Sequence, residues 1–438
     1  MTTPPTAADE VLDICRDLIR FDTSNYGDGS GPGERAAAEH VAGLLDEVGL
    51  TPEVFEGTPG RTNVVVRIPG EDPGRPALVL HGHTDVVPAR ADEWTVDPFG
   101  AEVEDGLVWG RGAVDMKDMD AMILAVVRQM QREGRRPARD VVVAMFADEE
   151  AGGVHGSRWC VENRPELFEG ATEAVSEVGG YSVDLDGRRL YLVQTAEKGI
   201  AWLRLVAEGR AGHGSQVTPD NAVVRLAEAV ARIGAYAWPL HLTPTVRTLL
   251  EGVADLTGLP FDPEDPATVD ALVDALGPAR RFVGATLRHT ANPTQLAAGY
   301  KANVVPRTAE ATLDGRFLPG DEATFDAVLK DLAGDHVRLE ELHRDVALES
   351  PVTGDLMDAM VDALLVEDPG AAVLPYTMSA GTDNKALSRL GITGYGFVPL
   401  LLPPELDFPG MFHGVDERVP VESLRFGTRV LDRLLRTC

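Results

Sequence analysis

The chain is poor in three features that would place it in other classes of protein: cysteine, long apolar runs and positive charge. Its three cysteines, Cys15, Cys160 and Cys438, are far apart and odd in number, which argues against a disulfide framework. Apolar runs stay short of the roughly eighteen residues of a membrane span. The first residues, MTTPPTAADE, have neither the basic nor the apolar region of a signal peptide. We therefore expect a cytoplasmic protein that does not span a membrane.

Lysine and arginine together number 40, against 70 aspartates and glutamates, so the formal net charge is −30. Nucleic acids and anionic membranes require a positive surface, so neither is expected as a partner. Most of the acidic excess is expected to form a solvated surface. The positions of a minority of the carboxylates indicate a different role.

Short, valine-rich runs at 63–68, 77–80, 141–146 and 173–178 predict strands, and helical patterns such as 116–132 separate several of them. This alternation predicts an α/β domain with a central, mostly parallel sheet flanked by helices. From about residue 197, a pattern of paired strands replaces the alternation of strands and helices. The alternation of helices and strands resumes near residue 350. We predict a catalytic domain formed by 1–196 and 350–438, interrupted by a smaller α+β domain at 197–349. A proline-rich, acidic stretch at about 238–290 is expected to be an extension of that smaller domain.

Five groups of acids and histidines lie at the ends of predicted strands or in the loops that follow. Open α/β sheets bind their ligands at this edge. The groups are HGHTD (81–85), GRGAVDMK (110–117), ADEEAGG (147–153), EVGG (177–180) and FHGVDE (412–417).

Spacing within the first group favours a metal ligand with a supporting carboxylate. Side chains two apart in an extended segment point the same way, so His83 and Asp85 can converge. A carboxylate beside a metal-binding imidazole orients it. Spacing alone does not choose between His81 and His83.

Each of the other groups has an ordinary interpretation when taken alone. Asp115 precedes a predicted helix and is typical of a helix N-cap. The acidic run Asp148–Glu150 is typical of a surface. The Glu177 segment is typical of a turn, and His413 of a structural loop histidine. Together, however, the groups supply two imidazoles and at least three carboxylates. Mixed nitrogen and oxygen ligands suit zinc, with cobalt or manganese as substitutes.

Seven motifs, in this order, resemble the dinuclear zinc aminoacylase and carboxypeptidase family. That family includes acetylornithine deacetylase, succinyl-diaminopimelate desuccinylase, glutamate carboxypeptidase and carnosinase-type dipeptidases. The resemblance spans essentially the whole chain, and the motifs are HGHTDVVP, GRGAVDMK, ADEEAGG, SEVGG, AGHGS, GTDNK and FHGVDERV.

The resemblance implies two metal ions, most simply Zn²⁺. It also decides which of His81 and His83 is a metal ligand, and which of Glu149 and Glu150 is the ligand and which the base. The implied ligands are His83 and Glu177 for one ion, Glu150 and His413 for the other, and Asp115 for both. Asp85 would orient His83. Glu149 would be the general base that deprotonates the bridging water and later protonates the leaving amine.

The resemblance also implies a substrate-binding lid, formed by 197–349, through which a homodimer can assemble. His213 would stabilise the oxyanion, often from the partner subunit. Asn303 and Arg316 would contact the substrate from the lid, and Gly381 and Thr382 from a loop of the catalytic domain. The ordinary alternatives are a loop histidine for His213 and a surface ion pair for Arg316. The chain departs from the family at Asn384-Lys385, where a small residue and arginine are frequent.

The implied function is a two-metal hydrolase that cleaves an amide bond in a small peptide or an N-acyl amino acid: a carboxypeptidase, a dipeptidase or an N-acyl-amino-acid deacylase. The alternative is a catalytically silent relative that binds small peptides or acts as a scaffold. An intact Glu149 and a full ligand set argue against it, because a binding protein needs no free base. A nucleotide-binding α/β protein would require a complete GxGxxG fingerprint, which GRGAVD does not provide.

Overall fold

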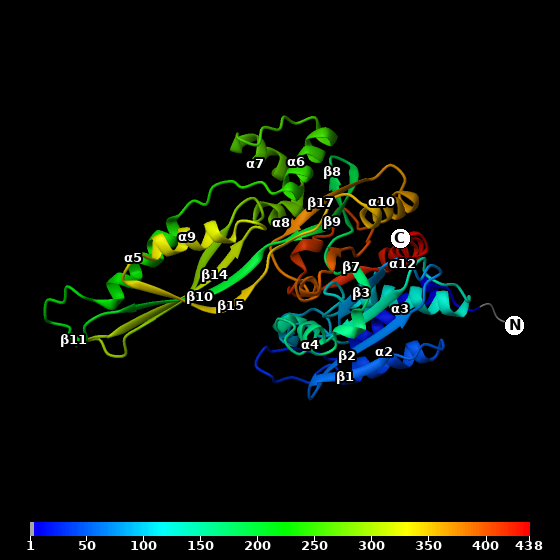
Figure 1. Ribbon diagram of the computed structural model, residues 1–438, viewed down its shortest axis with the longest axis horizontal. Coiled ribbons are helices and arrows are strands. Elements are labelled where there is room, and N and C mark those ends of the chain that lie inside the picture. The colour runs from blue at the N-terminus through cyan, green and yellow to red at the C-terminus, as the bar shows by residue number, and fades with distance from the viewer. Residues whose placement is uncertain (1–3) are drawn as a thin grey trace.

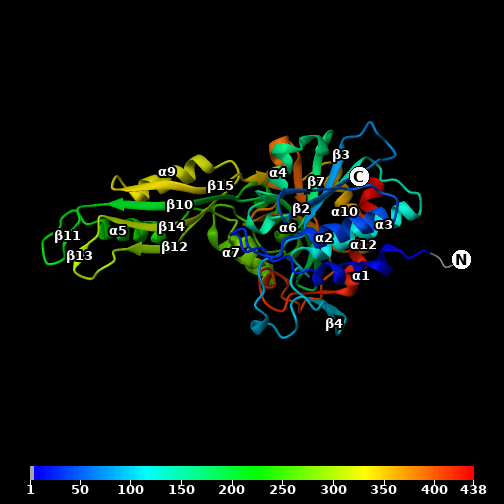
Figure 2. The same cartoon turned by 90° about the horizontal axis from the view of Figure 1, so that it is seen from below.

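The computed structural model describes residues 4–438. It shows a broad body built on one large sheet, and a narrow arm built on a small sheet that extends away from it (Figures 1 and 2). The arm comes from the middle of the chain. Both ends of the described chain lie in the body, so the chain leaves the body and returns to it.

The large sheet is mixed, and its centre is parallel. Strands β6, β3, β7 and β18 pair in parallel, while β1, β2, β8 and β16 pair antiparallel to their neighbours and β17 runs parallel to β9. In spatial order the sheet contains β1 (Glu53–Thr58), β2 (Arg61–Ile68), β6 (Val141–Phe146), β3 (Ala77–His83), β7 (Ala171–Ser176), β18 (Thr393–Gly396), β9 (Arg188–Glu197) and β16 (Leu348–Glu349), with β17 (Ala372–Met378) and β8 (Tyr181–Leu185) also paired to β9. The predicted α/β class is confirmed.

Helices cover both faces of this sheet, which explains why its strands are continuously apolar rather than alternating. In β6, Val141 and Val143 belong to the core on one face, and Val142 and Ala144 to the core on the other. The first face is covered by α1 (Ala7–Arg20), α2 (Arg35–Asp46), α3 (Lys117–Arg132), α10 (Asp355–Glu367) and α12 (Val421–Thr437), and the second by α4 (Ser157–Asn163) and α11 (Asn384–Leu387).

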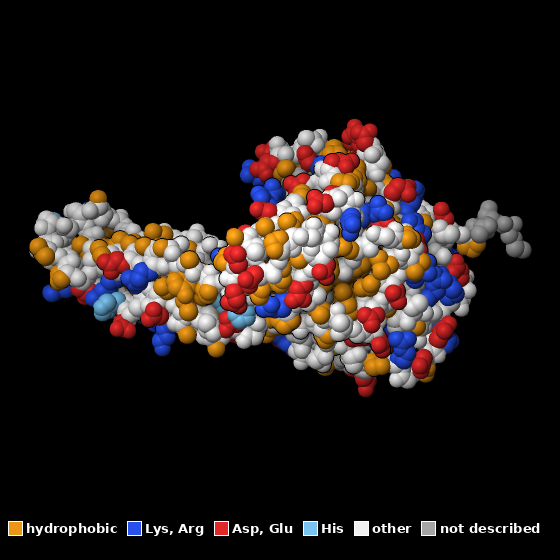
Figure 3. Space-filling view, turned by 90° about the horizontal axis from the view of Figure 1, so that it is seen from above, with side chains coloured by type: hydrophobic (Ala, Val, Ile, Leu, Met, Phe, Trp, Pro, Cys, Tyr) orange, Lys and Arg blue, Asp and Glu red, His pale blue; other side chains and the backbone are white. Residues whose placement is uncertain are grey.

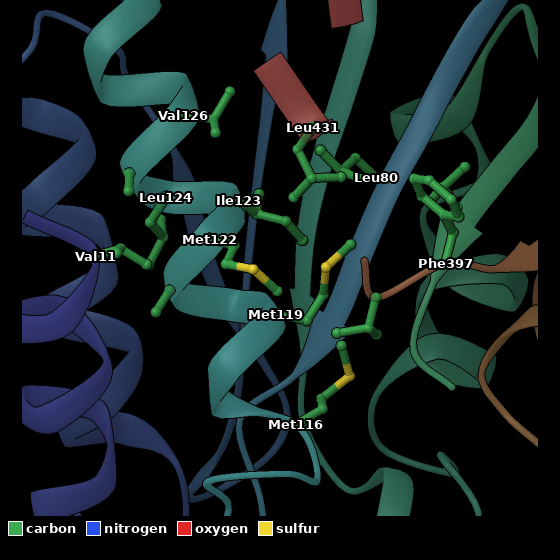
Figure 4. Close-up of a cluster of buried hydrophobic side chains, with 14 of the residues drawn as sticks. Val11, Leu80, Met116, Met119, Met122, Ile123, Leu124, Val126, Phe397 and Leu431 are labelled. Carbon is green, nitrogen blue, oxygen red and sulfur yellow. The ribbon is translucent and has the colours of Figure 1, made fainter. Parts of the chain in front are cut away.

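Helix α3 is the central helix of the first face. Figure 4 shows Met119 and Met122 on its sheet side, near Leu80 of β3, and Val11 of α1 on its other side. Nearly every residue of α3 is buried as a result. This packing fixes the start of the helix, and therefore Asp115 just before it, against the edge of the sheet.

The arm contains an antiparallel sheet with two helices on one face. Its core packs Leu226 and Ile233 of α5 and Phe325 of α9 against the sheet. The elements are β12 (Thr290–Ala298), β14 (Thr308–Phe317), β10 (Gly199–Glu208) and β15 (Val337–Asp345) in spatial order, with α5 (Ala222–Ala235), α9 (Glu322–Ala333) and a two-stranded ribbon of β11 (Gly212–His213) and β13 (Val304–Val305). The sequence analysis does not predict β12, an exposed edge strand with Pro293 at a break in its register.

The proline-rich stretch forms three helices that pack on the body. They are α6 (Pro244–Thr257), α7 (Pro266–Ala275) and α8 (Arg280–Gly284). Leu249 and Val253 of α6 and Leu272 of α7 join a core with Leu190 and Leu192 of β9, and Figure 1 shows α6 and α7 beside β8 and α8 beside β17. From its composition, this stretch is expected to extend the smaller domain. Its apolar helix faces are instead buried against β9 and β17, on the face of the sheet opposite the one that α10 and α12 cover.

A small antiparallel sheet completes the body. This three-stranded sheet contains β4 (Glu102–Glu104), β5 (Leu107–Trp109) and β19 (Arg418–Pro420). It joins the loop before Asp115 to the loop after His413.

Across residues 4–438, no helix combines the length and the apolarity needed to cross a membrane. On the face drawn in Figure 3, acidic and basic side chains are interspersed.

Candidate active site and metal centre

The predicted ligands meet at the carboxyl ends of three neighbouring parallel strands. Strand β3 lies between β6 and β7, and His83 is its last residue, paired with Phe146 at the end of β6. Glu149 and Glu150 follow β6, and Glu177 directly follows β7. The topology therefore brings one imidazole and three carboxylates from distant parts of the sequence to one edge.

Asp115 lies between two imidazoles and faces each with a different oxygen. Its Oδ1 is 3.3 Å from His83 Nε2, and its Oδ2 is 3.3 Å from His413 Nε2. On one side, Glu177 Oε2 is 3.4 Å and Glu149 Oε2 is 3.9 Å from His83 Nε2. On the other, Glu150 Oε2 is 3.2 Å from His413 Nε2. The N-cap interpretation of Asp115 is wrong: Met116 is the N-cap of α3, and no side chain caps that helix.

The charges of this site fit two divalent cations. His83 Nε2 is buried and has no hydrogen-bond partner, although carboxylates surround it. Burial raises the pKa of Glu177 to about 8. Hydrogen bonds to Asp115 and Glu150 raise the pKa of His413 to about 10. The protein alone therefore balances its excess negative charge by retaining protons, and cations bound between these oxygen and nitrogen donors would replace them.

His413 is the exposed member of the set. Its side chain is 59% exposed, against 1% for His83, and it lies in a loop with a left-handed backbone, φ 57°. One half of the site is therefore embedded in the sheet edge, and the other half is completed by a surface loop.

Asp85 holds the embedded half together from behind. Its carboxylate accepts hydrogen bonds from the backbone N–H groups of Glu149 and Glu150, each 3.1 Å long. Asn25 Nδ2 also donates to it, at 2.9 Å. His83 Nδ1 lies 3.0 Å from the backbone oxygen of Asp85 and 3.5 Å from its carboxylate, so the other ring nitrogen is directed at the cluster. Asp85 thus positions both the imidazole and the turn that carries Glu149.

The paired glycines after Glu177 are required by close backbone contact. Gly179 has φ 133°, and a Cβ there would lie 2.3 Å from the backbone oxygen of Gly396 in β18. Val178 adopts φ 57°, which is unusual for a β-branched residue. The turn is thus pressed against the neighbouring strand, and this contact holds Glu177 at the cluster.

His81 lies outside the cluster. Its Nε2 is 3.0 Å from Asn384 Oδ1, and its side chain is fully buried. Burial lowers its pKa to about 4, so the ring is neutral. The two histidines of HGHTD therefore have different surroundings: His83 faces carboxylates, and His81 faces an amide.

Three of the predicted substrate residues line a cavity of about 540 Å³ that opens on Glu149, Glu150 and His413; they are Arg316, Gly381 and Thr382. Arg316 donates to both oxygens of Asp314, at 2.7 and 3.2 Å. The hydroxyl of Thr382 is not free, because it donates to the buried carboxylate of Glu197 at 2.7 Å. The backbone N–H of Thr382 also donates to Glu197, at 3.1 Å. Arg316 therefore supplies a cation to the cavity, whereas both donors of Thr382 are held by Glu197.

His213 and Asn303 lie together at the far end of the arm. His213 is exposed in β11, and the N–H of Gly214 donates to the backbone oxygen of Asn303 at 2.9 Å. Figure 1 shows β11 at the tip, away from the body. Among the cavities formed by residues 4–438 that contain Glu149, neither is lined by these two residues.

Glu417 is a structural residue of the site to which the sequence analysis assigns no role. Its buried carboxylate accepts hydrogen bonds from Arg111 Nη1 at 2.8 Å and from the N–H groups of Gly112, Val114 and Asp115 at 2.9 to 3.0 Å. It therefore shapes the GRGAVD loop that presents Asp115. A carboxylate four residues after a histidine carries no local signal for this role, because its partners lie about three hundred residues away.

Lys385, where the chain departs from the family pattern, joins the two crossings between body and arm. Its Nζ donates to the backbone oxygens of Lys198 and Val346, each at 2.6 Å. Lys198 lies between β9 and β10, and Val346 between β15 and β16. The loop that carries Gly381 and Thr382 is thus fastened to both segments through which the arm joins the body.

Comparisons with known proteins agree with this geometry. Residues 79–437 match Peptidase family M20/M25/M40. The chain is 28% identical over 417 residues to aminoacylase-1 of Homo sapiens, covering 92% of this chain and 90% of that protein. It is 28% identical over 377 residues to the probable carboxypeptidase S-like 2 of Dictyostelium discoideum, covering 81% and 70%.

The fold is also that of a solved structure. The M20 family metallo-carboxypeptidase Sso-CP2 of Sulfolobus solfataricus superposes with a TM-score of 0.73 at 19% identity, over 98% of this chain and 99% of that one. With a family match over most of its length and a cluster of metal-ligating side chains at the sheet edge, the chain belongs to Peptidase family M20/M25/M40, and the predicted aminoacylase and carboxypeptidase resemblance is confirmed.

Proposed function

We propose that this protein hydrolyses the amide bond of N-acyl amino acids or small dipeptides with two divalent cations, most simply Zn²⁺, with Co²⁺ or Mn²⁺ as substitutes. The observation that carries the proposal is the position of Asp115, with one oxygen toward each imidazole. This is the arrangement that a shared ligand of two ions requires. Glu149 lies beside it and lines the cavity that would receive the substrate.

Glu149 is the general base of the proposed reaction. The cations would polarise the scissile carbonyl and lower the pKa of the attacking water. Burial and the neighbouring Glu177 raise the pKa of Glu149 well above its ordinary value, which makes its carboxylate a stronger proton acceptor. It takes a proton from the water and returns it to the leaving amine. Asp85 holds its backbone in place during both steps.

Arg316 would bind the carboxylate of the amino acid that leaves. A guanidinium suits a carboxylate because it donates two parallel hydrogen bonds, and Arg316 lines the cavity that reaches Glu149. The carboxylate would compete with Asp314, which Arg316 contacts here. Gly381 and Thr382 lie on the same wall. The backbone of Gly381 would contact the substrate there, and Thr382 would do so by exchanging its hydrogen bonds to Glu197 for the substrate.

His213 would act on the active site of a second copy of the chain, together with Asn303. Its place at the tip of the arm leaves it outside the cavities around its own Glu149. A symmetric homodimer formed through the arms would bring each tip toward the partner's body. The exposed edge strand β12 is available for such pairing.

Subunit complementation tests the donation of His213 across a dimer. His213→Ala and Glu149→Gln proteins should each be nearly inactive. After refolding them together, about half of the dimers are mixed and each mixed dimer contains one complete site, so about a quarter of the wild-type kcat should return. A mixture as inactive as its two parents would show that His213 does not act across subunits.

The activity itself is tested with a metal-loaded protein and a substrate panel. N-acetyl, N-succinyl and N-formyl amino acids and dipeptides are compared by amine release, before and after a chelator. We expect chelator-sensitive hydrolysis of at least one class, restored by Zn²⁺, Co²⁺ or Mn²⁺. A protein that binds two metal equivalents and hydrolyses none of them would instead be the silent, peptide-binding relative.

A further inference from the structure

A second cavity opens on the same carboxylates as the Arg316 cavity. It has a volume of about 230 Å³. The two cavities share Glu149, Glu150, Gly381 and His413 in their linings. A molecule held at these carboxylates can therefore extend into both cavities, with one part on each side of the scissile bond.

The linings of the two cavities differ in chemistry. The lining of the first is charged: it contains Arg316, Arg158 and Lys385 together with Asp345 and Asp383. Arg158 is paired with Asp345, and Lys385 donates to two backbone oxygens, so Arg316 is the cation nearest to being available for a ligand. Beyond the metal-binding cluster, the second cavity is lined mainly by apolar and aromatic side chains, namely Val178, Phe282, Tyr376, Met378 and Phe412, with Ser379 and Ala380. Among residues 4–438, no lysine or arginine contributes to this lining. One cavity suits a carboxylate, and the other suits an uncharged, apolar group.

One wall of the apolar cavity comes from the helices inserted between residues 244 and 284. Phe282 lies in α8 of this insertion. Its ring meets that of Phe412 edge to face, with 6.0 Å between centroids and an interplanar angle of 83°. Phe412 directly precedes His413, so the insertion packs beside the metal-binding loop. The insertion thus shapes the active site as well as covering the sheet.

We infer that the apolar cavity receives the acyl group of the substrate, and that Phe282 makes the enzyme selective for apolar acyl groups larger than acetyl. This inference rests on the proposed function. With the carboxylate of the amino acid at Arg316 and the scissile carbonyl at Asp115 and Glu149, the acyl chain can continue only away from Arg316. The apolar cavity is the space on that side.

The size of the cavity indicates which acyl groups fit. An apolar cavity of about 150 Å³ holds benzene, so about 230 Å³ accommodates a phenylacetyl group or a medium-length alkyl chain. Each buried methylene should raise kcat/KM about fourfold. N-octanoyl-leucine should therefore exceed N-acetyl-leucine by about two powers of ten if only half of the added methylenes are buried.

The test compares this ratio in the metal-loaded wild type, Phe282→Ala and Phe261→Ala. Phe261 belongs to the same insertion and packs on the same core, but it does not line the cavity. We expect Phe282→Ala to lower the octanoyl-to-acetyl ratio of kcat/KM about tenfold, and Phe261→Ala to keep the wild-type ratio. Calorimetric Kd values for N-octanoyl-leucine and N-acetyl-leucine, measured in a Glu149→Gln background, should show the same loss of preference for the octanoyl compound in Phe282→Ala.

Three results would overturn the inference. A wild-type ratio near one would show that the acyl group does not enter the cavity. Equal ratios in wild type and Phe282→Ala would remove Phe282 as the selective residue. A preference that follows the amino-acid side chain while acyl length has no effect would reverse the two subsites. Hydrolysis of N-acetyl-leucine in any of these cases leaves the proposed function standing, whereas turnover of neither compound removes both.

Discussion

Replacing Glu149 by glutamine should lower kcat by about two to four powers of ten while both metal equivalents remain bound. Glutamine keeps the size of the side chain but cannot accept the proton of the attacking water. The backbone N–H of Glu149 would still donate to Asp85, so the turn should keep its shape. The measurement pairs steady-state kinetics with metal analysis of the same protein sample.

Glu162→Gln is the matched control for this substitution. Glu162 belongs to α4, and its side chain is 62% exposed in a surface ion pair with Arg389. Its replacement should leave kcat close to the wild-type value. A Glu149→Gln protein with two bound metals and wild-type kcat would show that another group serves as the base.

Asp115→Ala and His413→Ala should differ in the number of metal ions that they lose. Asp115 is the proposed shared carboxylate, so its removal should reduce the metal content from two equivalents to well below one. His413 contacts only one half of the site, through Asp115 and Glu150, and its removal should leave about one equivalent. Elemental analysis after dialysis against metal-free buffer measures both.

His336→Ala is the control for loss of a histidine. His336 is exposed in the turn before β15, and its replacement should leave both metal equivalents bound. Two bound equivalents in His413→Ala would show that the second site is assigned to the wrong residues. One retained equivalent in Asp115→Ala would show that each ion is held independently.

Local patterns were sufficient to predict the layers of the body. The valine run at 141–146 is a strand from the first residue to the last. A strand buried on both faces needs side chains that are apolar at every position, and the shortness and valine content of the run favour a strand over a buried helix. The same logic located the acids and histidines: a polar residue directly after such a strand lies at the sheet edge, wherever the strand is placed. Family resemblance then proposed their roles.

Local patterns failed where a residue's role depends on a partner far along the chain. Because His81 and His83 are two residues apart in a strand, the sequence predicts that they point to the same side and does not show which is the ligand. The contact of His81 with Asn384, 303 residues away, is what gives the two histidines different roles. Asp115 has the local signature of a helix cap and is instead directed at two imidazoles. Strand β12 was missed because it is an exposed edge that carries a proline.

The sequence by itself therefore determined the α/β class, the strand-end positions of the candidate ligands and the family. Hydrophobic periodicity and short motifs encode these properties within a few residues. Only the tertiary structure decided that Glu417 shapes the loop of Asp115, that Lys385 fastens the loop of Gly381 and Thr382 to the arm, and that the inserted helices lie beside His413. Each of these depends on packing between segments whose separation in the chain carries no local signal.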